Sequence, residues 1–233
     1  MLALHDLHAH YGRAHILQGV TLAAARGEVL ALLGRNGAGK STTMKSIIGL
    51  VPPTAGRVVF DGADIAGQEP FAIARRGIGY VPEERRIFTE LSVLENLEVG
   101  RRPARQDQQG WTPARLFELF PSLGAMRDRP GGRMSGGEQQ MLTIARTLMG
   151  NPRLILLDEP SEGLAPVIVE RMAEAILALK REGLTIILSE QNLHFARLVA
   201  DRATIIEKGR IQYDGAMDAL MADEAVRAQY LSV

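Results

Sequence analysis

The stretch Gly34-Arg-Asn-Gly-Ala-Gly-Lys40-Ser41 decides the fold of this chain. It follows an apolar run of buried-strand length, Glu28–Leu33, and leads into a segment whose apolar residues have helical spacing, Gly39–Gly49. A glycine-rich loop between a strand and a helix surrounds phosphate groups with backbone N–H groups, and the helix N-terminus adds positive potential. The stretch therefore predicts an α/β fold with a phosphate-binding loop.

Two side chains at the end of this loop are of the types that bind a nucleotide and its Mg²⁺ ion. Lys40 is expected to reach the terminal phosphates, and Ser41 is expected to bind Mg²⁺. A glycine-rich turn before an ordinary helix is the simpler alternative, but the flanking strand and helix favour the phosphate loop. The predicted nucleotide contacts in this loop are Gly34, Arg35, Asn36, Gly37, Ala38, Gly39, Lys40, Ser41 and Thr42.

A second motif, Leu154-Ile-Leu-Leu-Asp158-Glu159-Pro160, lies far downstream and ends an apolar run with two carboxylates. A buried strand would present Asp158 at its carboxyl end, where it can hold Mg²⁺ beside Ser41. Glu159 could then activate a water molecule for attack on a phosphate. Alone, the pattern also fits an acidic turn. Together with the phosphate loop, it predicts nucleotide hydrolysis.

A third motif, Ser135-Gly-Gly-Glu138-Gln139, opens a predicted helix that extends to Met149. The Ser-x-x-Glu pattern is also a capping box, which satisfies N–H groups at a helix start. That explanation leaves the two glycines in the first turn unaccounted for, since each costs about 1 kcal/mol relative to alanine. Backbone without side chains at a helix N-terminus allows a phosphate to approach closely.

The whole chain, residues 1–233, is predicted to form a single domain with a helical insertion at residues 84–150. Apolar runs of strand length alternate with helical stretches in the second half, which predicts a parallel sheet with its site at the carboxyl ends of the strands. The predicted strands there are Leu154–Leu157, Leu184–Leu188 and Ala203–Ile206. Strands are also predicted in the first thirty residues, and one or two short helices at 215–233.

The composition of the chain excludes several classes of function. The 233 residues include 27 basic and 27 acidic side chains and no cysteine. The balanced charge counts against nucleic-acid binding, and the missing cysteines exclude disulfide frameworks, thiol nucleophiles and cysteine metal sites. No apolar run reaches the roughly 18 residues of a membrane span, and no signal-peptide pattern starts the chain. We therefore expect a cytoplasmic protein.

The order and spacing of the three motifs resemble the ATP-binding subunit of ABC transporters. Gly34–Ser41 is similar to the Walker A loop, Met134–Gln139 to the signature sequence, and Leu154–Glu159 to the Walker B strand. The resemblance implies an ATPase that uses ATP and Mg²⁺, with a P-loop core, a mainly parallel sheet, an antiparallel β subdomain and the helical insertion. It also implies a head-to-tail dimer in which each signature helix caps the partner's γ-phosphate. The implied contacts are Ser135, Gly136, Gly137 and Glu138.

The resemblance also implies roles for three further residues, each at a position that matches a functional position of the family. Tyr11 is similar to the aromatic that stacks on adenine, although an aromatic at a strand end is also explained by β-propensity. Glu83 stands where most members have a Mg²⁺-binding glutamine, and a carboxylate is also a competent ligand. Gln191 stands where most members have a histidine on the γ-phosphate; its amide can donate a hydrogen bond but carries no proton at neutral pH. Glu159, Lys40 and Gln191 are the expected catalytic residues.

With Glu83 and Gln191 at these positions, the chain resembles one subgroup of the family. This subgroup is the second ATP-binding subunit of importers for branched-chain and other hydrophobic amino acids. The resemblance implies membrane permease subunits, a second ATP-binding subunit in a homo- or heterodimer, and an extracytoplasmic substrate-binding protein, but no nucleic acid. The expected place is the cytoplasmic side of the inner membrane. The alternatives are an ATPase of a urea or short-chain amide importer, a soluble non-transport ABC ATPase, and a phosphate-loop kinase.

Overall fold

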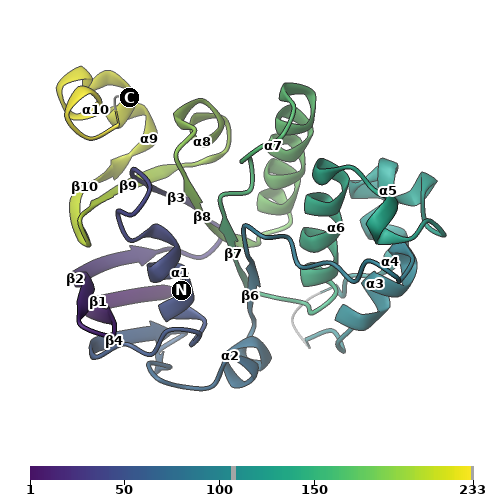
Figure 1. Ribbon diagram of the computed structural model, residues 1–233, viewed down its shortest axis with the longest axis horizontal. Helices are drawn as coiled ribbons and strands as arrows, with labels where there is room; N and C mark the ends of the chain where they lie inside the picture. The colour runs from purple at the N-terminus through teal and green to yellow at the C-terminus, as the bar shows by residue number, and fades with distance from the viewer. Residues whose placement is uncertain (106–108, 232–233) are drawn as a thin grey trace.

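Strand β3 (Val29–Leu33) runs into the phosphate loop and helix α1 (Lys40–Ile47), as the sequence predicts. The structure is a computed structural model that describes residues 1–105 and 109–231 (Figure 1). β3 lies inside a six-stranded sheet with the order β10-β9-β3-β8-β7-β6. The other strands of this sheet are β6 (Ile78–Val81), β7 (Leu154–Asp158), β8 (Thr185–Glu190), β9 (Arg202–Glu207) and β10 (Arg210–Ala216).

The six-stranded sheet is mainly parallel, which confirms the predicted fold class. Only β10 pairs antiparallel, with β9. Strand β10 was not predicted from the sequence, because the alternation at this edge is short: Ile211 and Tyr213 are half-buried between exposed residues. Two short helices follow it, α9 (Met217–Ala222) and α10 (Glu224–Tyr230), as predicted; residues 232–233 of the predicted helical segment lie outside the described residues.

A four-stranded sheet with the order β2-β1-β4-β5 forms the antiparallel β part. Its strands are β1 (Leu2–Tyr11), β2 (Ala14–Ala24), β4 (Ala55–Phe60) and β5 (Ala63–Asp64). The alternation of β1 is imperfect in the sequence because Asp6 has a positive φ of 49° and the register with β2 shifts between Leu4 and Leu7. The irregularity keeps both leucines in the core.

Two hydrophobic cores lie on opposite faces of the six-stranded sheet. Residues of β3 alternate between them: Leu30 and Leu32 pack in one core, and Val29, Ala31 and Leu33 in the other. Helix α1 fills the space between the two sheets, since it contacts β2, β7 and β8 (Figure 1). Helices α6 (Gly136–Leu148), α7 (Pro166–Arg181) and α8 (Leu193–Val199) bring their buried residues to the other face. Burial on both faces explains why the strands are continuously apolar.

The helices of the predicted insertion gather at one end of the molecule, to the right in Figure 1. They are α3 (Val93–Gly100), α4 (Pro113–Leu119), α5 (Pro121–Ala125), a 3-10 turn at Gly131–Arg133, and α6. Residues 106–108 of the segment lie outside the described residues. One short helix, α2 (Pro70–Arg76), was not predicted, because it buries only Ile73 and has no apolar periodicity to detect. In the described ranges, no helix combines the length and apolar character of a membrane span.

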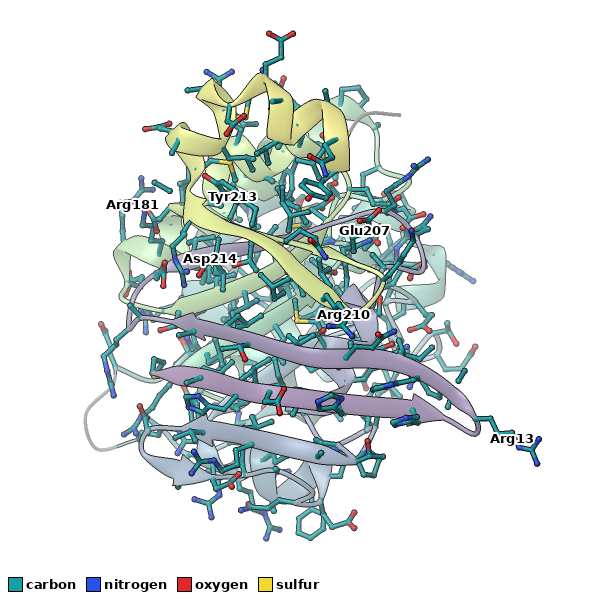
Figure 2. The ribbon with its side chains drawn as sticks, turned by 90° about the vertical axis from the view of Figure 1, so that its left-hand side faces the viewer. Arg13, Arg181, Glu207, Arg210, Tyr213 and Asp214 are labelled. Carbon is teal, nitrogen blue, oxygen red and sulfur yellow. The ribbon has the colours of Figure 1, made fainter. Side chains whose placement is uncertain are left out.

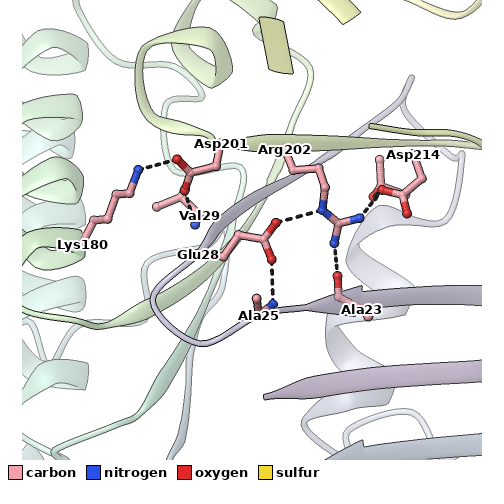
Figure 3. A network of polar contacts seen from close by, with 9 residues as sticks. Ala23, Ala25, Glu28, Val29, Lys180, Asp201, Arg202 and Asp214 are labelled. Atoms are coloured by element: carbon pink, nitrogen blue, oxygen red, sulfur yellow. Dashed lines mark hydrogen bonds and ion pairs between the residues drawn. The ribbon is translucent and has the colours of Figure 1, made fainter. Parts of the chain in front are cut away.

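Polar contacts tie the two sheets together. Strand β10 lies beside β2, and Arg210 at its start bonds Gln18 Oε1 through Nη2 at 3.2 Å (Figure 2). Arg202 on β9 donates to Glu28 Oε1 at 2.8 Å, to Asp214 and to the carbonyl oxygen of Ala23 (Figure 3). One guanidinium thus joins β9, β10 and the end of β2.

We predict that Arg202→Ala destabilises the protein by about 1.5–3 kcal/mol, because hydrogen bonds to two carboxylates and one carbonyl are lost. Denaturant unfolding measures this loss. Arg26→Ala is the matched control: its side chain is 63% exposed and, among the described residues, pairs with Asp61 alone, so its cost should stay below about 1 kcal/mol. Equal effects of the two substitutions would contradict the bracing role of Arg202.

Candidate functional site

The polar residues of the predicted site meet at the carboxyl ends of three neighbouring parallel strands. β3 leads into the phosphate loop, β7 ends at Asp158, and β8 ends at Glu190. The register pairs Asp158 with Ser189 and Leu33 with Glu190, so the three chain ends leave the sheet at one level. The structure therefore brings the first and second motifs together although they are far apart in the sequence.

The phosphate loop has the backbone conformation that its glycines allow. Gly39 has a φ of 116° directly before α1. A Cβ on Gly34 would collide with the carbonyl oxygen of Ile206 on β9. The side chain of Lys40 folds back over the loop, and its Nζ donates to the carbonyl oxygens of Gly34 at 2.8 Å and Arg35 at 3.2 Å. The ammonium group is thereby held at the loop, where a phosphate would bind.

Asp158 is the centre of a hydrogen-bond network. Its Oδ1 accepts from Ser41 Oγ at 3.0 Å and from Ser189 Oγ at 2.6 Å, and its Oδ2 accepts from Tyr80 Oη at 3.0 Å. Burial and the Asp158 carboxylate raise the pKa of Tyr80, so its hydroxyl stays a donor. Sequence reasoning missed Tyr80 and Ser189. Their positions on β6 and at the end of β8 were the available signal, because polar groups there face the same edge.

The predicted magnesium ligands Ser41 and Asp158 have a separation that fits one cation. Two oxygens in neighbouring octahedral positions, each at about 2.1 Å from Mg²⁺, lie about 3 Å apart, and Ser41 Oγ lies 3.0 Å from Asp158 Oδ1. Glu83 is exposed on the loop after β6 and makes no hydrogen bond to either residue in the described part of the chain. The same residues contain no cluster of three or more His, Asp or Glu side chains that could hold a metal alone.

Glu159 is buried, and its polar partners include Lys40, Gln191, Ser189 and Glu162. Its Oε1 lies 3.0 Å from Lys40 Nζ, its Oε2 accepts from Gln191 Nε2 at 2.7 Å, and its backbone N–H faces the Oγ and carbonyl oxygen of Ser189. Burial alone would raise the pKa of Glu159, but the hydrogen bonds from Gln191 and Lys40 and the charge of Lys40 outweigh it and lower that pKa. The carboxylate is therefore ionised and able to accept a proton.

The signature residues Ser135–Glu138 begin α6, away from this network. The capping box is present: Ser135 Oγ accepts from the backbone of Glu138 at 3.4 Å, and Glu138 Oε2 accepts from the backbone of Ser135 at 2.7 Å. In the described ranges no hydrogen bond joins these residues to the phosphate loop. Tyr11, 49% exposed at the end of β1, likewise makes no hydrogen bond to Asp158 or Glu159 among the described residues.

The two glycines of the signature have close neighbours that explain their small size. Arg85 Nη1 lies 2.5 Å from the place that a Cβ on Gly136 would take, and Ile168 Cγ2 lies 2.6 Å from the corresponding place at Gly137. Arg85 has a left-handed φ of 63°, and its carbonyl oxygen accepts from Thr143 Oγ1 at 2.7 Å. Sequence reasoning missed this contact between the loop after β6 and α6.

The sequence model of the family described as ABC transporter matches residues 17–162, which is more than half of the chain. The chain belongs to the ABC transporter family. It is an ATP-binding cassette and an ATPase, and the resemblance of its three motifs to this family is confirmed.

Similar ABC proteins cover almost the whole chain. The high-affinity branched-chain amino acid transport ATP-binding protein BraG of Pseudomonas aeruginosa is 41% identical, with 99% of both chains covered. The lipopolysaccharide export system ATP-binding protein LptB of Escherichia coli is 38% identical, covering 96% of this chain and 93% of that protein. A solved ATP-binding cassette of an ABC transporter in its ADP conformation superimposes with a TM-score of 0.83 at 27% identity, covering 98% and 97% of the two chains.

We predict that Lys40→Met lowers the free energy of unfolding by about 3 kcal/mol at about pH 8, because it leaves a buried carboxylate without its cation. The pKa of Glu159 should rise in this variant. The loss should therefore shrink as the pH falls toward about 5, where protonation removes the buried charge. Denaturant unfolding of the nucleotide-free protein at several pH values measures both effects.

The double variant Lys40→Met/Glu159→Gln is the control, because it removes the charge as well as its partner. It should be more stable than Lys40→Met at about pH 8 and show a weaker dependence on pH. Native stability of Lys40→Met at this pH would contradict the ion pair.

Proposed function

We propose that this ABC ATPase powers an importer for branched-chain or other hydrophobic amino acids. The similarity to BraG carries the proposal, since 41% identity extends over 99% of both chains. The probable branched-chain amino acid transport ATP-binding protein LivF of Archaeoglobus fulgidus, 34% identical over 96% of this chain, supports it. The LptB relatives belong to a lipopolysaccharide export system. The experiment must therefore measure which compound is transported, in addition to ATP hydrolysis.

In the proposed reaction, the phosphate loop and Lys40 bind the phosphates of ATP. The carboxylate of Glu159 accepts a proton from the water whose oxygen attacks the γ-phosphorus, and ADP leaves. Gln191 holds Glu159 through its amide, and it has a second N–H for a phosphate oxygen. The lowered pKa keeps Glu159 ionised, and its carboxylate lies 3.0 Å from Lys40 Nζ, beside the loop where the phosphates are proposed to bind.

Ser41 and Asp158 are the proposed ligands of Mg²⁺, with Glu83 as a further ligand from the loop after β6. The ion would neutralise charge on the phosphate oxygens. Tyr80 and Ser189 would orient the Asp158 carboxylate through the hydrogen bonds that they donate to it. Tyr11 is the proposed stacking partner of adenine.

The signature residues are proposed to act on a nucleotide held by a second ATP-binding subunit. Ser135, Gly136, Gly137 and Glu138 stand apart from the phosphate loop of their own chain, which supports this division. The N-terminus of their helix carries the positive end of the helix dipole, which favours a phosphate. Arg85 and Ile168 fill the space that side chains on Gly136 and Gly137 would take, so the proposed contact is through the backbone and Ser135. The second subunit is either another copy of this chain or a homologous ATP-binding subunit.

The proposed partners in the membrane are permease subunits, and a groove beside the helical insertion is their proposed docking surface. Four of the seven large apolar side chains that are exposed in the described ranges line this groove: Leu50, Phe71, Phe88 and Val99. The guanidinium of Arg75 lies 5.4 Å from the ring of Phe71, and that of Arg146 lies 5.0 Å from the ring of Phe88. An apolar segment with acidic residues would match this lining.

The wider system follows from these proposals. Residues 1–233 act as one cassette, with 84–150 as the helical insertion that contacts the permease. The chain lies on the cytoplasmic side of the inner membrane and is attached there through the permease subunits. An extracytoplasmic binding protein delivers the substrate.

We predict that removal of this chain from its organism abolishes high-affinity uptake of radiolabelled leucine, and that the unaltered chain restores it. The Glu159→Gln variant should bind ATP yet fail to restore uptake, because its amide cannot accept the proton. Uptake of labelled urea and acetamide is measured in the same strains.

Loss of urea or amide uptake with normal leucine uptake would replace the proposed substrate but keep the ATPase. Restored leucine uptake with Glu159→Gln would contradict the catalytic role of Glu159. Normal uptake of all three compounds without the chain would contradict both import proposals.

We also predict that Phe71→Ser removes most of the integral membrane subunits that co-purify with the tagged chain from detergent-solubilised membranes. The ring is 61% exposed, so the substitution should leave the melting temperature unchanged. Val167→Ser, at a side chain that is 53% exposed and lies outside the groove, is the matched control. Unchanged recovery of permease subunits with Phe71→Ser would contradict docking in the groove.

A further inference from the structure

The last residues of β8 hold the segment that follows β7. Ser189 bonds Asp158 and the backbone of Glu159, and Gln191 bonds the carboxylate of Glu159. Glu190, between them, bonds the backbone of Ser161. The proposed function gives a role to Gln191 and Ser189 but none to Glu190.

Glu190 joins two backbone segments with its two oxygens. Its Oε1 accepts from the N–H of Ser161 at 3.0 Å, and its Oε2 accepts from the N–H of Asn192 at 3.2 Å. The side chain is 2% exposed, and Ser161 is 6% exposed. Asn192 in turn caps α8 by accepting from the backbone of Phe195 at 3.1 Å. The carboxylate therefore bridges the segment after Glu159 and the turn that contains Gln191.

A carboxylate in this position is costly, which argues that its two acceptors are needed. Burial raises the pKa of Glu190, and the hydrogen bonds from Ser161 and Asn192 act against that rise. No lysine or arginine forms an ion pair with it in the described ranges. A glutamine would fit the same space, but its amide offers only one oxygen and would turn an NH₂ group toward one of the two N–H groups.

The bridged segments include the two groups that contact each other at the proposed catalytic site. Glu159 lies two residues before Ser161, Gln191 lies one residue before Asn192, and the two side chains are joined by a hydrogen bond of 2.7 Å. Glu159 itself has a left-handed φ of 48°, so its direction depends on how the chain is held on both sides. Glu190, Gln191, Glu159 and Ser161 line one pocket.

We propose that Glu190 is a positioning residue for ATP hydrolysis: its two carboxylate oxygens fix Ser161 and Asn192, and thereby align Glu159 with Gln191. This inference rests on the proposed role of Glu159. In the described ranges the Glu190 carboxylate makes no hydrogen bond to the phosphate loop, so it acts on the catalytic step and not on ATP binding. Small errors in the position of a catalytic group reduce rates strongly.

The test uses the purified full chain and steady-state ATP hydrolysis. Glu190→Gln should lower kcat by at least about tenfold and change KM for ATP by less than about twofold. Glu190→Asp keeps the charge but is too short to reach both N–H groups, so its kcat should also fall several-fold. Glu170→Gln removes a carboxylate from the same pocket, where it has no hydrogen bond in the described ranges, and should change kcat by less than about twofold.

A double-variant cycle tests the route of the effect. In a Gln191→Ala background, where the alignment is already lost, Glu190→Gln should lower kcat by less than about twofold further. Additive effects, native kcat in Glu190→Gln, or full activity in Glu190→Asp would overturn the proposal. If the native chain shows no ATPase activity, or if Glu159→Gln retains native activity, the proposed function is wrong. Those outcomes differ from the ones that overturn only the role of Glu190.

Discussion

Parallel pairing of β3, β7 and β8 is the constraint on which the site depends. Because the strands run in one direction and in register, Asp158 stands opposite Ser189, and Leu33 stands opposite Glu190. Every residue just past these positions must leave the sheet at the same edge. Hydrogen bonds across that edge then replace the lost ladder, and they connect the phosphate loop, the acidic turn after β7 and the turn after β8 into one network.

Much of this arrangement could be predicted from the sequence, since buried strands and glycine-rich loops have strong local signals. The elements around Lys40 and Asp158 and the contact between Ser41 and Asp158 are examples. Tyr80 and Ser189 could not be identified from motifs, because their importance arises only from the strand order. β10 was not predicted because it is an edge strand whose apolar residues, Ile211 and Tyr213, are few and only half-buried. The hydrogen bond between Gln191 and Glu159 could not be predicted either, because it depends on how the turns after β7 and β8 pack.

The charge balance of the chain conceals an uneven local distribution. Glu159, Glu162 and Glu190 line one pocket, and Lys40 is the cation paired with the first of them. The pKa of Glu162 is raised by its hydrogen bond to Glu159, by burial and by the neighbouring carboxylates. Repulsion among these acids favours partners that bring positive charge or N–H groups to this face. A net charge of zero therefore says little about the forces at the site.

Tyr80 has a consequence beyond its hydrogen bond. It lines the apolar groove with Phe71 and Phe88, while its hydroxyl donates to Asp158. The groove and the proposed cation site are thus separated by the length of one rigid aromatic side chain. A displacement of the ring in the groove would therefore change the hydrogen bond that it donates to the Asp158 carboxylate. A mechanical signal between the two surfaces needs no long chain of residues to carry it.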